Sequence, residues 1–529
     1  MIHETGTGGK KMWEQILSGI ENINNVLNDI VWGWPVIILI LGTGILLTIR
    51  TKFLQVRKFG ESLNTTIVPA VKSLGKKKTR SGKAKLNAVS QFEAFSTAIS
   101  GTVGTGNIIG VVSAILTGGP GAVFWMWISA FFGMVTNYSE NVLGLYFRKK
   151  DKHGNLSGGS FYYIAYGLKW KWLAYCAAIF CVFAAIGMSG VQTNKISGTI
   201  SEAFSGAGPD AEIVKLSVGI IVAIVAAVII IGGIQRIGRV TSMLVPFMSL
   251  LFIIMALIAI CMHIGNIPKA FGLIFEKAFN FQAAGGGILG YSFAQVIKKG
   301  MARGVFSNEA GLGSSVIAHS ASETKEPVKQ GLWGIFEVFF DTFIICTLTS
   351  LTFLTTFDLD KLSSDMNDSA MSMAMFSNNF GNFGVIVFSI ILPLFAFTTI
   401  IAWSYYGEKA VEFCFGGISE KKRNIIVKAF KVIYILLIAV SATIHSDLIW
   451  AIDDTFNGLM AVPNLICLVA LSGLVAKITK NYFDRKRGKQ LEPMLSAYPD
   501  MNREFKEDLE AEAQEGDADD SGRNTENAP

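Results

Sequence analysis

Long apolar runs separated by short polar segments dominate the chain. A helix needs about 20 apolar residues to cross a hydrocarbon core, and about eleven runs approach that length. The runs occupy residues 33–50, 92–116, 120–146, 170–194, 212–233, 237–262, 285–317, 330–356, 382–408, 425–443 and 452–477. The pattern predicts an all-α polytopic membrane protein whose membrane domain covers residues 31–480.

The two ends of the chain have other patterns. Residues 11–30, KMWEQILSGIENINNVLNDI, place apolar side chains at helical intervals. This stretch is expected to form a helix on the membrane surface, within an N-terminal amphipathic segment of residues 1–30. No signal peptide is evident before the first apolar run. Residues 481–529 begin basic and then become acidic, with few apolar residues from Glu504 to Pro529. This composition predicts a largely disordered tail.

Lysine and arginine gather in every second loop, which predicts the orientation in the membrane. The basic loops contain Lys52–Lys85, Arg148–Lys152, Arg236–Arg239, Lys325–Lys329 and Lys421–Arg423. The alternate segments Ser201–Glu212 and Leu359–Ser377 are poor in basic residues. Basic loops face the cytoplasm, so an odd number of spans places the N-terminus outside and the C-terminus in the cytoplasm. The expected location is the cell (inner) membrane.

Two of the expected spans are unusual because glycine and polar residues interrupt them. Residues 92–116 contain GTVGTGN, and residues 285–317 contain KKGMARGVFSNEAGLGSS. An aromatic-rich run follows each of them. Interrupted segments at matching positions of two halves are typical of inverted-repeat transporters. The pattern predicts five spans in repeat one, at about 90–262, five in repeat two, at about 285–477, and an extra N-terminal helix.

Composition supports a membrane protein and argues against several other classes. Hydrophobic residues make up 51% of the 529 positions and charged residues only 16%. The net charge of +6 lies in loops and gives no sign of nucleic-acid binding. The six cysteines form no CxxC pair, and no HExxH, GxSxG or P-loop string occurs. Nothing in the sequence indicates an enzyme or an obligate protein partner.

The segment from Gly101 to Asn107 has the composition of a ligand site inside the membrane. Three glycines in seven residues allow the backbone to unwind and to approach a ligand closely. Freed amides at a half-helix N-terminus suit a carboxylate, while freed carbonyls and the Asn107 side chain suit a cation. The alternative is that small residues serve close helix packing. The neighbouring threonines and Asn107 favour a site.

A second candidate lies in the string FTTIIAW. The hydroxyls of Thr398 and Thr399 can complete a sodium shell, or they can bond carbonyls of their own helix. Trp403 follows Thr399 by one turn, so it can wall a small pocket or simply pack. Both alternatives stay open on chemistry alone.

Acidic residues within membrane spans are functional candidates. Glu309 and Asp341 are the ones most plausibly part of a network, and Arg303 or Lys299 are near enough in sequence to pair with Glu309. A charge pair that holds the bundle together is the slightly favoured role for both acids.

Four strings resemble the sodium:alanine (alanine or glycine:cation) symporter family. They are GTVGTGNIIG, GGPGAVFWMWISAFFGMVTNYSEN, ARGVFSNEAGLGSS and FAFTTIIAWSYYGEKA. The resemblance covers roughly residues 30–480. It implies the leucine-transporter fold, with a site between two inverted repeats near the bilayer midplane. It also implies sodium as the coupling ion and alanine, glycine or a similar amino acid as the substrate.

The resemblance further implies the residues of the site. The amides near Thr105 and Gly106 take the substrate carboxylate, with Asn107 beside them. Carbonyls near Ser100 and Val103, with Thr398 and Thr399, resemble the sodium site of the fold. The second broken helix is expected around Gly300–Phe306. The complete substrate set is Thr102, Gly104, Thr105, Gly106, Asn107, Gly187, Gln192, Thr399 and Trp403.

Other functions are open at this point. A proton-coupled carrier of the same fold is the nearest alternative, although it would more readily place a lysine or an acid where Thr398 and Thr399 stand. A sodium-coupled carrier for a larger amino acid, such as glutamine, is another. A membrane acyltransferase needs an intramembrane histidine or a nucleophile with a base, and His319 falls at an expected cytoplasmic end. A channel would normally need symmetric subunits or a charged ring.

Overall fold

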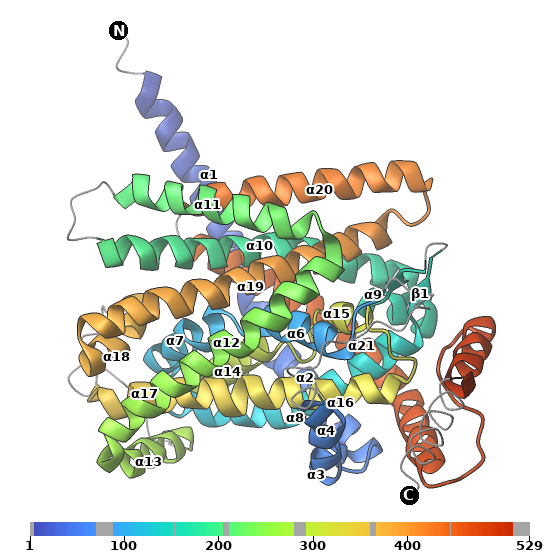
Figure 1. Cartoon of the computed structure of the whole chain (residues 1–529). Coiled ribbons are helices and arrows are strands. Elements are labelled where there is room, and N and C mark those ends of the chain that lie inside the picture. Colours follow the sequence, from blue (N-terminus) through green and yellow to red (C-terminus); the bar gives the residue numbers. More distant parts are fainter. Residues whose placement is uncertain are drawn as a thin grey trace, which may run out of the picture.

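The computed structural model describes residues 5–69, 88–151, 154–204, 211–279, 293–359, 367–444 and 446–511. These residues are mostly helical. The long helices α8 (Ala122–Tyr146), α10 (Lys171–Phe204) and α19 (Asn382–Cys414) run in one bundle with the continuous helical stretch that begins with α16 (Pro327–Val338) (Figure 1). Helices suit this apolar chain because lipid offers no partner to backbone amides and carbonyls, so each span must satisfy its own.

Eight helical stretches of the described chain are long and apolar enough to cross a membrane. They are Ser18–Arg50, Lys171–Ala203, Ala211–Ile230, Gly233–Met262, Pro327–Thr356, Asn382–Cys414, Glu420–Ser441 and Leu448–Lys486. The other three expected spans are the two interrupted segments and α8 (Ala122–Tyr146). α8 carries Asn137, Glu140 and Asn141, all buried within the protein. Eleven spans in two inverted repeats therefore stay a prediction.

The elements follow one another along the chain as a series of helices with one small hairpin. In order they are α1 (Thr5–Val31), α2 (Trp34–Arg50), α3 (Leu54–Arg57), α4 (Phe59–Thr65), α6 (Gln91–Thr102), η1 (Thr105–Asn107), α7 (Ile109–Gly118), α8, β1 (Lys149–Lys150), β2 (Leu156–Ser157), α9 (Ser160–Tyr163), η2 (Ile164–Leu168), α10 (Lys171–Phe204), α11 (Ala211–Ile230), α12 (Gly233–Met262), η3 (Ile264–Asn266), α13 (Ile267–Ala278), α14 (Phe293–Asn308), α15 (Val316–His319), α16 (Pro327–Val338), η4 (Phe339–Cys346), α17 (Thr347–Thr356), α18 (Asp368–Phe380), α19 (Asn382–Cys414), α20 (Glu420–Ser441) and α21 (Ser446–Lys486).

The packing of the long helices positions the two interrupted segments. α10 lies against both α19 and α21, while α8 lies against α14 and α16. α6 contacts α12 and α19. Segments far apart in the sequence thus surround the break between α6 and α7.

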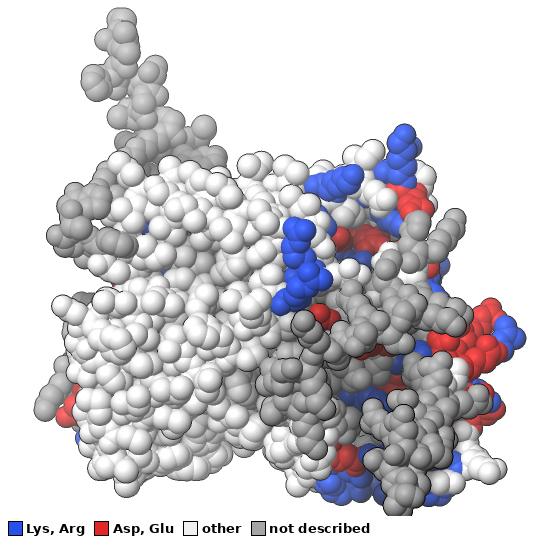
Figure 2. All heavy atoms as spheres, viewed as in Figure 1, with Lys and Arg blue, Asp and Glu red and all other residues white. Residues whose placement is uncertain are grey.

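Charged residues gather at one end of the bundle, where β1 and the described end of the chain lie (Figures 1 and 2). β1 and β2 pair antiparallel there, with Lys149 opposite Ser157. Residues 499–511 are helical, and Phe505 is fully buried in a small cluster with Leu156 and Leu495. The expectation of disorder from residue 504 is therefore wrong for 504–511, because Phe505 gives this stretch an apolar anchor. Residues 512–529 lie outside the described residues.

The end of α1 packs on α21. The Trp32 indole nitrogen donates to the main-chain oxygen of Asp454 at 3.1 Å, and the Asn28 amide donates to the side chain of Thr455 at 3.2 Å. α1 leads into α2 with a short interruption and projects from the bundle at its other end (Figure 1). Its placement on a membrane surface stays a prediction.

Candidate substrate and ion site

The first interruption is a true break in a buried helix. α6 begins with a capping box between Ser90 and Glu93 and ends at Thr102. Gly104 is extended, with φ −129° and ψ −153°, and a single 3-10 turn leads to α7. Every residue from Ser100 to Asn107 is buried. The predicted unwound segment is therefore present, and it lies inside the protein.

Side chains from three elements satisfy the backbone groups that the break frees. The Gly104 amide donates to Oδ1 of Asn107 at 2.9 Å, and the Thr105 amide donates to Oε1 of Gln192 at 3.3 Å. The Thr399 hydroxyl donates to the main-chain oxygen of Ser100 at 2.9 Å. These amides and this carbonyl are the groups expected to hold a carboxylate and a cation. In this conformation the side chains of Asn107, Gln192 and Thr399 hydrogen-bond these groups instead.

Close packing at the break requires its glycines. A Cβ on Gly104 would lie 2.6 Å from Thr399 Oγ1, and a Cβ on Gly101 would lie 2.8 Å from the Tyr406 hydroxyl. A Cβ on Gly106 would lie 3.3 Å from the ring of Phe306. The segment whose backbone groups are freed from helical hydrogen bonds is therefore also closely packed.

The two threonines of α19 have different surroundings. Thr399 bonds Ser100 across the interface and also the Phe395 carbonyl of its own helix, at 3.1 Å. Thr398 donates to the Phe395 carbonyl at 2.9 Å, and its hydroxyl lies 3.6 Å from the sulfur of Met248 on α12. In this conformation the Thr399 hydroxyl is hydrogen-bonded to the broken helix, and the Thr398 hydroxyl is directed to Phe395 and Met248.

The remaining expected residues of α6 are also close to the break. Val103 is fully buried and its amide bonds the Ile99 carbonyl at 2.8 Å. The Thr102 hydroxyl donates to the same carbonyl at 3.1 Å. The Ser100 hydroxyl donates to Thr97 O at 2.8 Å. The main-chain oxygen of Ser100 is a separate atom, and it accepts the hydrogen bond from Thr399.

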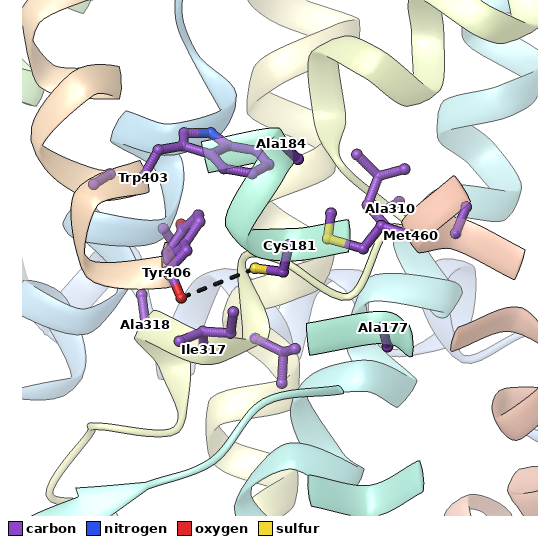
Figure 3. Packing of buried hydrophobic residues seen from close by; sticks show 14 of the residues in the cluster. Ala177, Cys181, Ala184, Ala310, Ile317, Ala318, Trp403, Tyr406 and Met460 are labelled. Carbon is purple, nitrogen blue, oxygen red and sulfur yellow. Dashed lines mark hydrogen bonds between the residues drawn. The ribbon is translucent and has the colours of Figure 1, made fainter. Parts of the chain in front are cut away.

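Trp403 is fully buried and donates a hydrogen bond to an acidic residue. Its indole nitrogen donates to Oε1 of Glu309 at 3.0 Å, and Ser314 bonds the other oxygen of that carboxylate. Figure 3 shows Trp403 and Tyr406 facing Cys181 and Ala184 of α10. Arg303 lies 3.7 Å from Asp454, so the expected pairing of Arg303 with Glu309 is wrong. The α14 helix carries Arg303 toward α21 and leaves Glu309 beyond its end.

The second interruption falls later than expected. Gly300–Phe306 lies within the continuous helix α14, and the break covers residues 309–315. Glu309, Gly311 and Gly313 have φ values of 55°, 98° and 75°, a region that glycine adopts readily. A Cβ on Gly300 would lie 2.4 Å from the Ala122 carbonyl of α8. The earlier glycine thus serves helix packing and not unwinding.

Polar side chains also form hydrogen bonds with the backbone of this second break. Glu140 on α8 accepts the Gly311 amide at 3.1 Å, and Asn464 on α21 donates to the Gly311 carbonyl at 2.9 Å. The Ser160 hydroxyl donates to the Gly313 carbonyl at 2.9 Å. None of these partners was predicted from the sequence. The signal for Glu140 and Asn464 is a polar residue within a long apolar helix, whereas Ser160 begins the short helix α9.

Asp341 connects the first break to the last turn of α14. Its Oδ1 accepts the Asn107 amide at 2.6 Å, and its Oδ2 accepts the Ser307 hydroxyl of α14 at 2.8 Å. Thr349 donates to the main-chain oxygen of Asn107 at 2.8 Å. Asp341 lies in η4, a π-helical stretch, and is fully buried. Asp341 and Glu309 are both members of buried networks, which was one of the two roles expected for them. The slightly favoured role, a charge pair, is wrong, because the hydrogen-bond partners of both carboxylates among the described residues are neutral.

The two expected pocket residues of α10 face different neighbours. Gln192 is buried and bonds the break, as described above. Gly187 instead faces α21, where a Cβ would lie 2.9 Å from Oδ1 of Asp453. In this conformation the structure brings Gln192, Thr399, Asn107 and Ser100 together and places Gly187 beside Asp453.

Comparison with known proteins agrees with this architecture. A family model described as "Sodium:alanine symporter family" matches residues 17–496. The sodium/alanine symporter AgcS of Methanococcus maripaludis is 40% identical over 465 residues, which cover 87% of this chain and 96% of that protein. The probable sodium/glutamine symporter GlnT of Bacillus subtilis is 35% identical over 471 residues, covering 88% and 92%. The crystal structure of MhsT in complex with L-phenylalanine matches with a TM-score of 0.51 at 14% identity, covering 74% and 98%, and shows a shared fold.

Proposed function

Since the chain belongs to the sodium:alanine symporter family, a family of membrane transporters and not of enzymes, we propose that it carries alanine or glycine into the cell together with sodium. The break between α6 and α7 is the proposed binding site. The observation that carries this proposal is the set of backbone groups at the break, Ser100 O, Gly104 N and Thr105 N, each held by a neutral side chain.

Neutral partners suit a site that must load and release its cargo. In the loaded state, the amides near Thr105 and Gly106 bind the substrate carboxylate, and Asn107 and Gln192 turn toward the substrate. The carbonyls near Ser100 and Val103, with the hydroxyls of Thr398 and Thr399, bind sodium. Uncharged oxygen ligands bind a cation more weakly than carboxylates do, so the ion can dissociate in each transport cycle.

A small substrate fits the surroundings of this site. Trp403 is fully buried, and Gly104 leaves less than one methyl group of space beside Thr399. Loading must therefore move α19 or α10 away from the break, and only a short side chain then fits beside Trp403. Alternating access of this kind follows from two inverted repeats that move relative to each other.

A larger cargo is the second candidate, because GlnT of Bacillus subtilis is named a probable sodium/glutamine symporter. The same backbone groups would serve glutamine, which has the same carboxylate and ammonium groups as alanine. Glutamine would require more space around Trp403. A proton as coupling ion is less well supported, because Thr399 stands where such a carrier would place an ionisable group.

Uptake into proteoliposomes tests the proposal. Purified protein is reconstituted, and labelled alanine, glycine and glutamine are offered with an inward sodium, lithium or proton gradient. We expect alanine or glycine uptake to require sodium. Uptake that is equally fast with a proton gradient in sodium-free buffer contradicts sodium coupling. Uptake of glutamine in preference to alanine contradicts the small substrate.

A further inference from the structure

Asp453 is a fully buried carboxylate that has no partner. It lies on α21, none of its surface is exposed, and neither carboxylate oxygen accepts a hydrogen bond from any described residue. An ionised carboxylate without a partner is strongly unfavourable in such a place. The group must therefore carry a proton in this conformation or have a cation beside it.

A second unsatisfied oxygen lies one turn further along α21. Asn457 is fully buried, its amide nitrogen donates to the main-chain oxygen of Asp453 at 3.0 Å, and its Oδ1 has no donor. Residues four apart lie on the same face of a helix. Asp453 and Asn457 together offer three acceptor oxygens on one face and no donor among the described residues to fill them.

On the opposite side, the Asp453 side chain packs directly against the backbone of a glycine, Gly187 of α10. A Cβ on Gly187 of α10 would lie 2.9 Å from Oδ1 and 3.0 Å from Cβ of Asp453. Gly187 precedes Gln192 by five residues, or about 7.5 Å along the helix axis. Since Gln192 bonds the Thr105 amide, the Asp453 carboxyl group lies about that far along α10 from the break.

The charged and titratable groups around Asp453 do not neutralise it. Arg303 on α14 lies 3.7 Å from Asp454, the neighbour of Asp453 on α21, and also stacks on Trp450. Glu309, beyond the end of α14, is engaged by Trp403 and Ser314. The Tyr434 hydroxyl of α20 donates to the Ile400 carbonyl at 2.8 Å. Asp453 thus has two further acids near it, Asp454 and Glu309, and the nearby cation, Arg303, lies against Asp454.

We propose that Asp453 and Asn457 form an exchangeable site for one monovalent positive charge. In the described conformation the Asp453 carboxyl group holds a proton. When the pathway opens, its O–H bond breaks and the proton passes to water. A cation then binds the carboxylate and Asn457 Oδ1, so the net charge of the site is unchanged. This inference rests on the proposed transport function.

Two sources can supply the cation, and both have the same chemistry at the site. The α-ammonium group of the amino acid carries three N–H donors, which match the three oxygens. A sodium ion would use the same oxygens together with water. The two sources differ in whether the proton leaves on addition of sodium alone or only when alanine is also present.

Proton release from the purified protein tests the site. Full-length protein in weakly buffered detergent solution receives sodium chloride and then alanine, with a pH indicator present. We expect the wild type to release roughly one proton per transporter. Release on sodium alone assigns the site to the ion, and release only after alanine assigns it to the ammonium group. Potassium chloride followed by an uncharged sugar should release none.

Two variants complete the release experiment. Asp453→Asn keeps the shape of the side chain and should abolish the release. Asp484→Asn is the matched control: Asp484 lies on the same helix but is ion-paired with Lys489 at 3.1 Å, so the release should persist. Equal release from Asp453→Asn and wild type overturns the proposal. So does the absence of release from a wild type that transports alanine.

A third variant covers the case in which Asp453→Asn does not fold. Asn457→Leu removes only the neighbouring acceptor and should raise the half-saturating concentration of sodium or alanine roughly tenfold. Unchanged values for both overturn the two-residue site. If the wild type releases a proton on sodium addition but takes up neither alanine nor glycine, the cation site stands and the proposed substrate is wrong.

Discussion

The hydroxyl of Thr399 on α19 donates to the main-chain oxygen of Ser100, the carbonyl one turn before the break that ends α6, at 2.9 Å. The two residues are separated by 299 positions in the chain. This hydrogen bond joins the broken helix to α19, which α6 also contacts elsewhere. It also places a neutral hydroxyl beside the carbonyl that we propose as a sodium ligand.

Removing the Thr399 hydroxyl should weaken sodium or alanine binding. Thr399→Val keeps the shape of the side chain and removes only the oxygen. The loss of one buried neutral partner costs about 1–3 kcal/mol, which corresponds to a roughly tenfold to hundredfold rise in the half-saturating concentration. The measurement is uptake against sodium and alanine concentration, with expression and the gel-filtration profile unchanged.

Thr352→Val is the matched control for this change. Thr352 is equally buried, but its hydroxyl donates only to Leu348 O of its own helix, at 2.8 Å. Its transport should stay near that of the parent. If both valine variants show the sodium dependence of the parent, Thr399 is not a ligand.

Trp403 should limit the size of the substrate. Trp403→Ala removes a large buried side chain beside α10, so alanine transport should weaken and larger amino acids should compete. Trp403→Phe keeps most of the volume but removes the hydrogen bond to Glu309. It should keep the size limit and lower stability by about 1–3 kcal/mol. Competition assays and thermal unfolding in detergent measure the two effects. An unchanged substrate range in Trp403→Ala makes Trp403 a packing residue.

Gly104 should tolerate no side chain. In Gly104→Ala the new Cβ would lie 2.6 Å from Thr399 Oγ1 and 3.3 Å from Gln192 Nε2, so the contacts at the break must separate. Overpacking of this kind costs about 1–3 kcal/mol, and uptake should fall at least tenfold. Gly110→Ala in α7 is the control because, beyond its own turn of helix, no described atom lies within 4 Å of its added Cβ. Similar uptake by the two variants would show that Gly104 is not part of the binding site.

The N-terminus should lie outside the cell and the C-terminus inside. The test introduces single cysteines at positions 5 and 515 of a variant without native cysteines, which is needed because Cys261 is exposed. An impermeant thiol reagent on intact cells should label position 5 and spare position 515 until the membrane is opened. Labelling of position 515 in intact cells reverses the predicted orientation.

The location of the first break was visible in the sequence because its cause is local. Three glycines between Gly101 and Gly106 weaken one stretch of helix wherever it packs. Apolar run lengths and family strings are local signals of the same kind. They predicted a helical membrane protein of the sodium:alanine symporter family, and both are confirmed.

The second break shows where local signals are insufficient. Gly300 and Gly311 lie in one glycine-rich stretch, yet the first packs against α8 and the second adopts a φ of 98°. Glycine permits both uses, and the choice depends on the neighbouring helix. The sequence therefore located the interrupted region but not the residues that unwind.

The sequence by itself determined the class of molecule, its family and the first broken helix, because each of these depends on residues near one another in the chain. Only the tertiary structure decided that Thr399 bonds Ser100, that Arg303 approaches Asp454 and not Glu309, and that Asp453 faces Gly187 without a partner. Each of these contacts depends on how α10, α14, α19 and α21 rotate and pack against one another. That packing is a collective result of many side chains, so no single stretch of sequence specifies it.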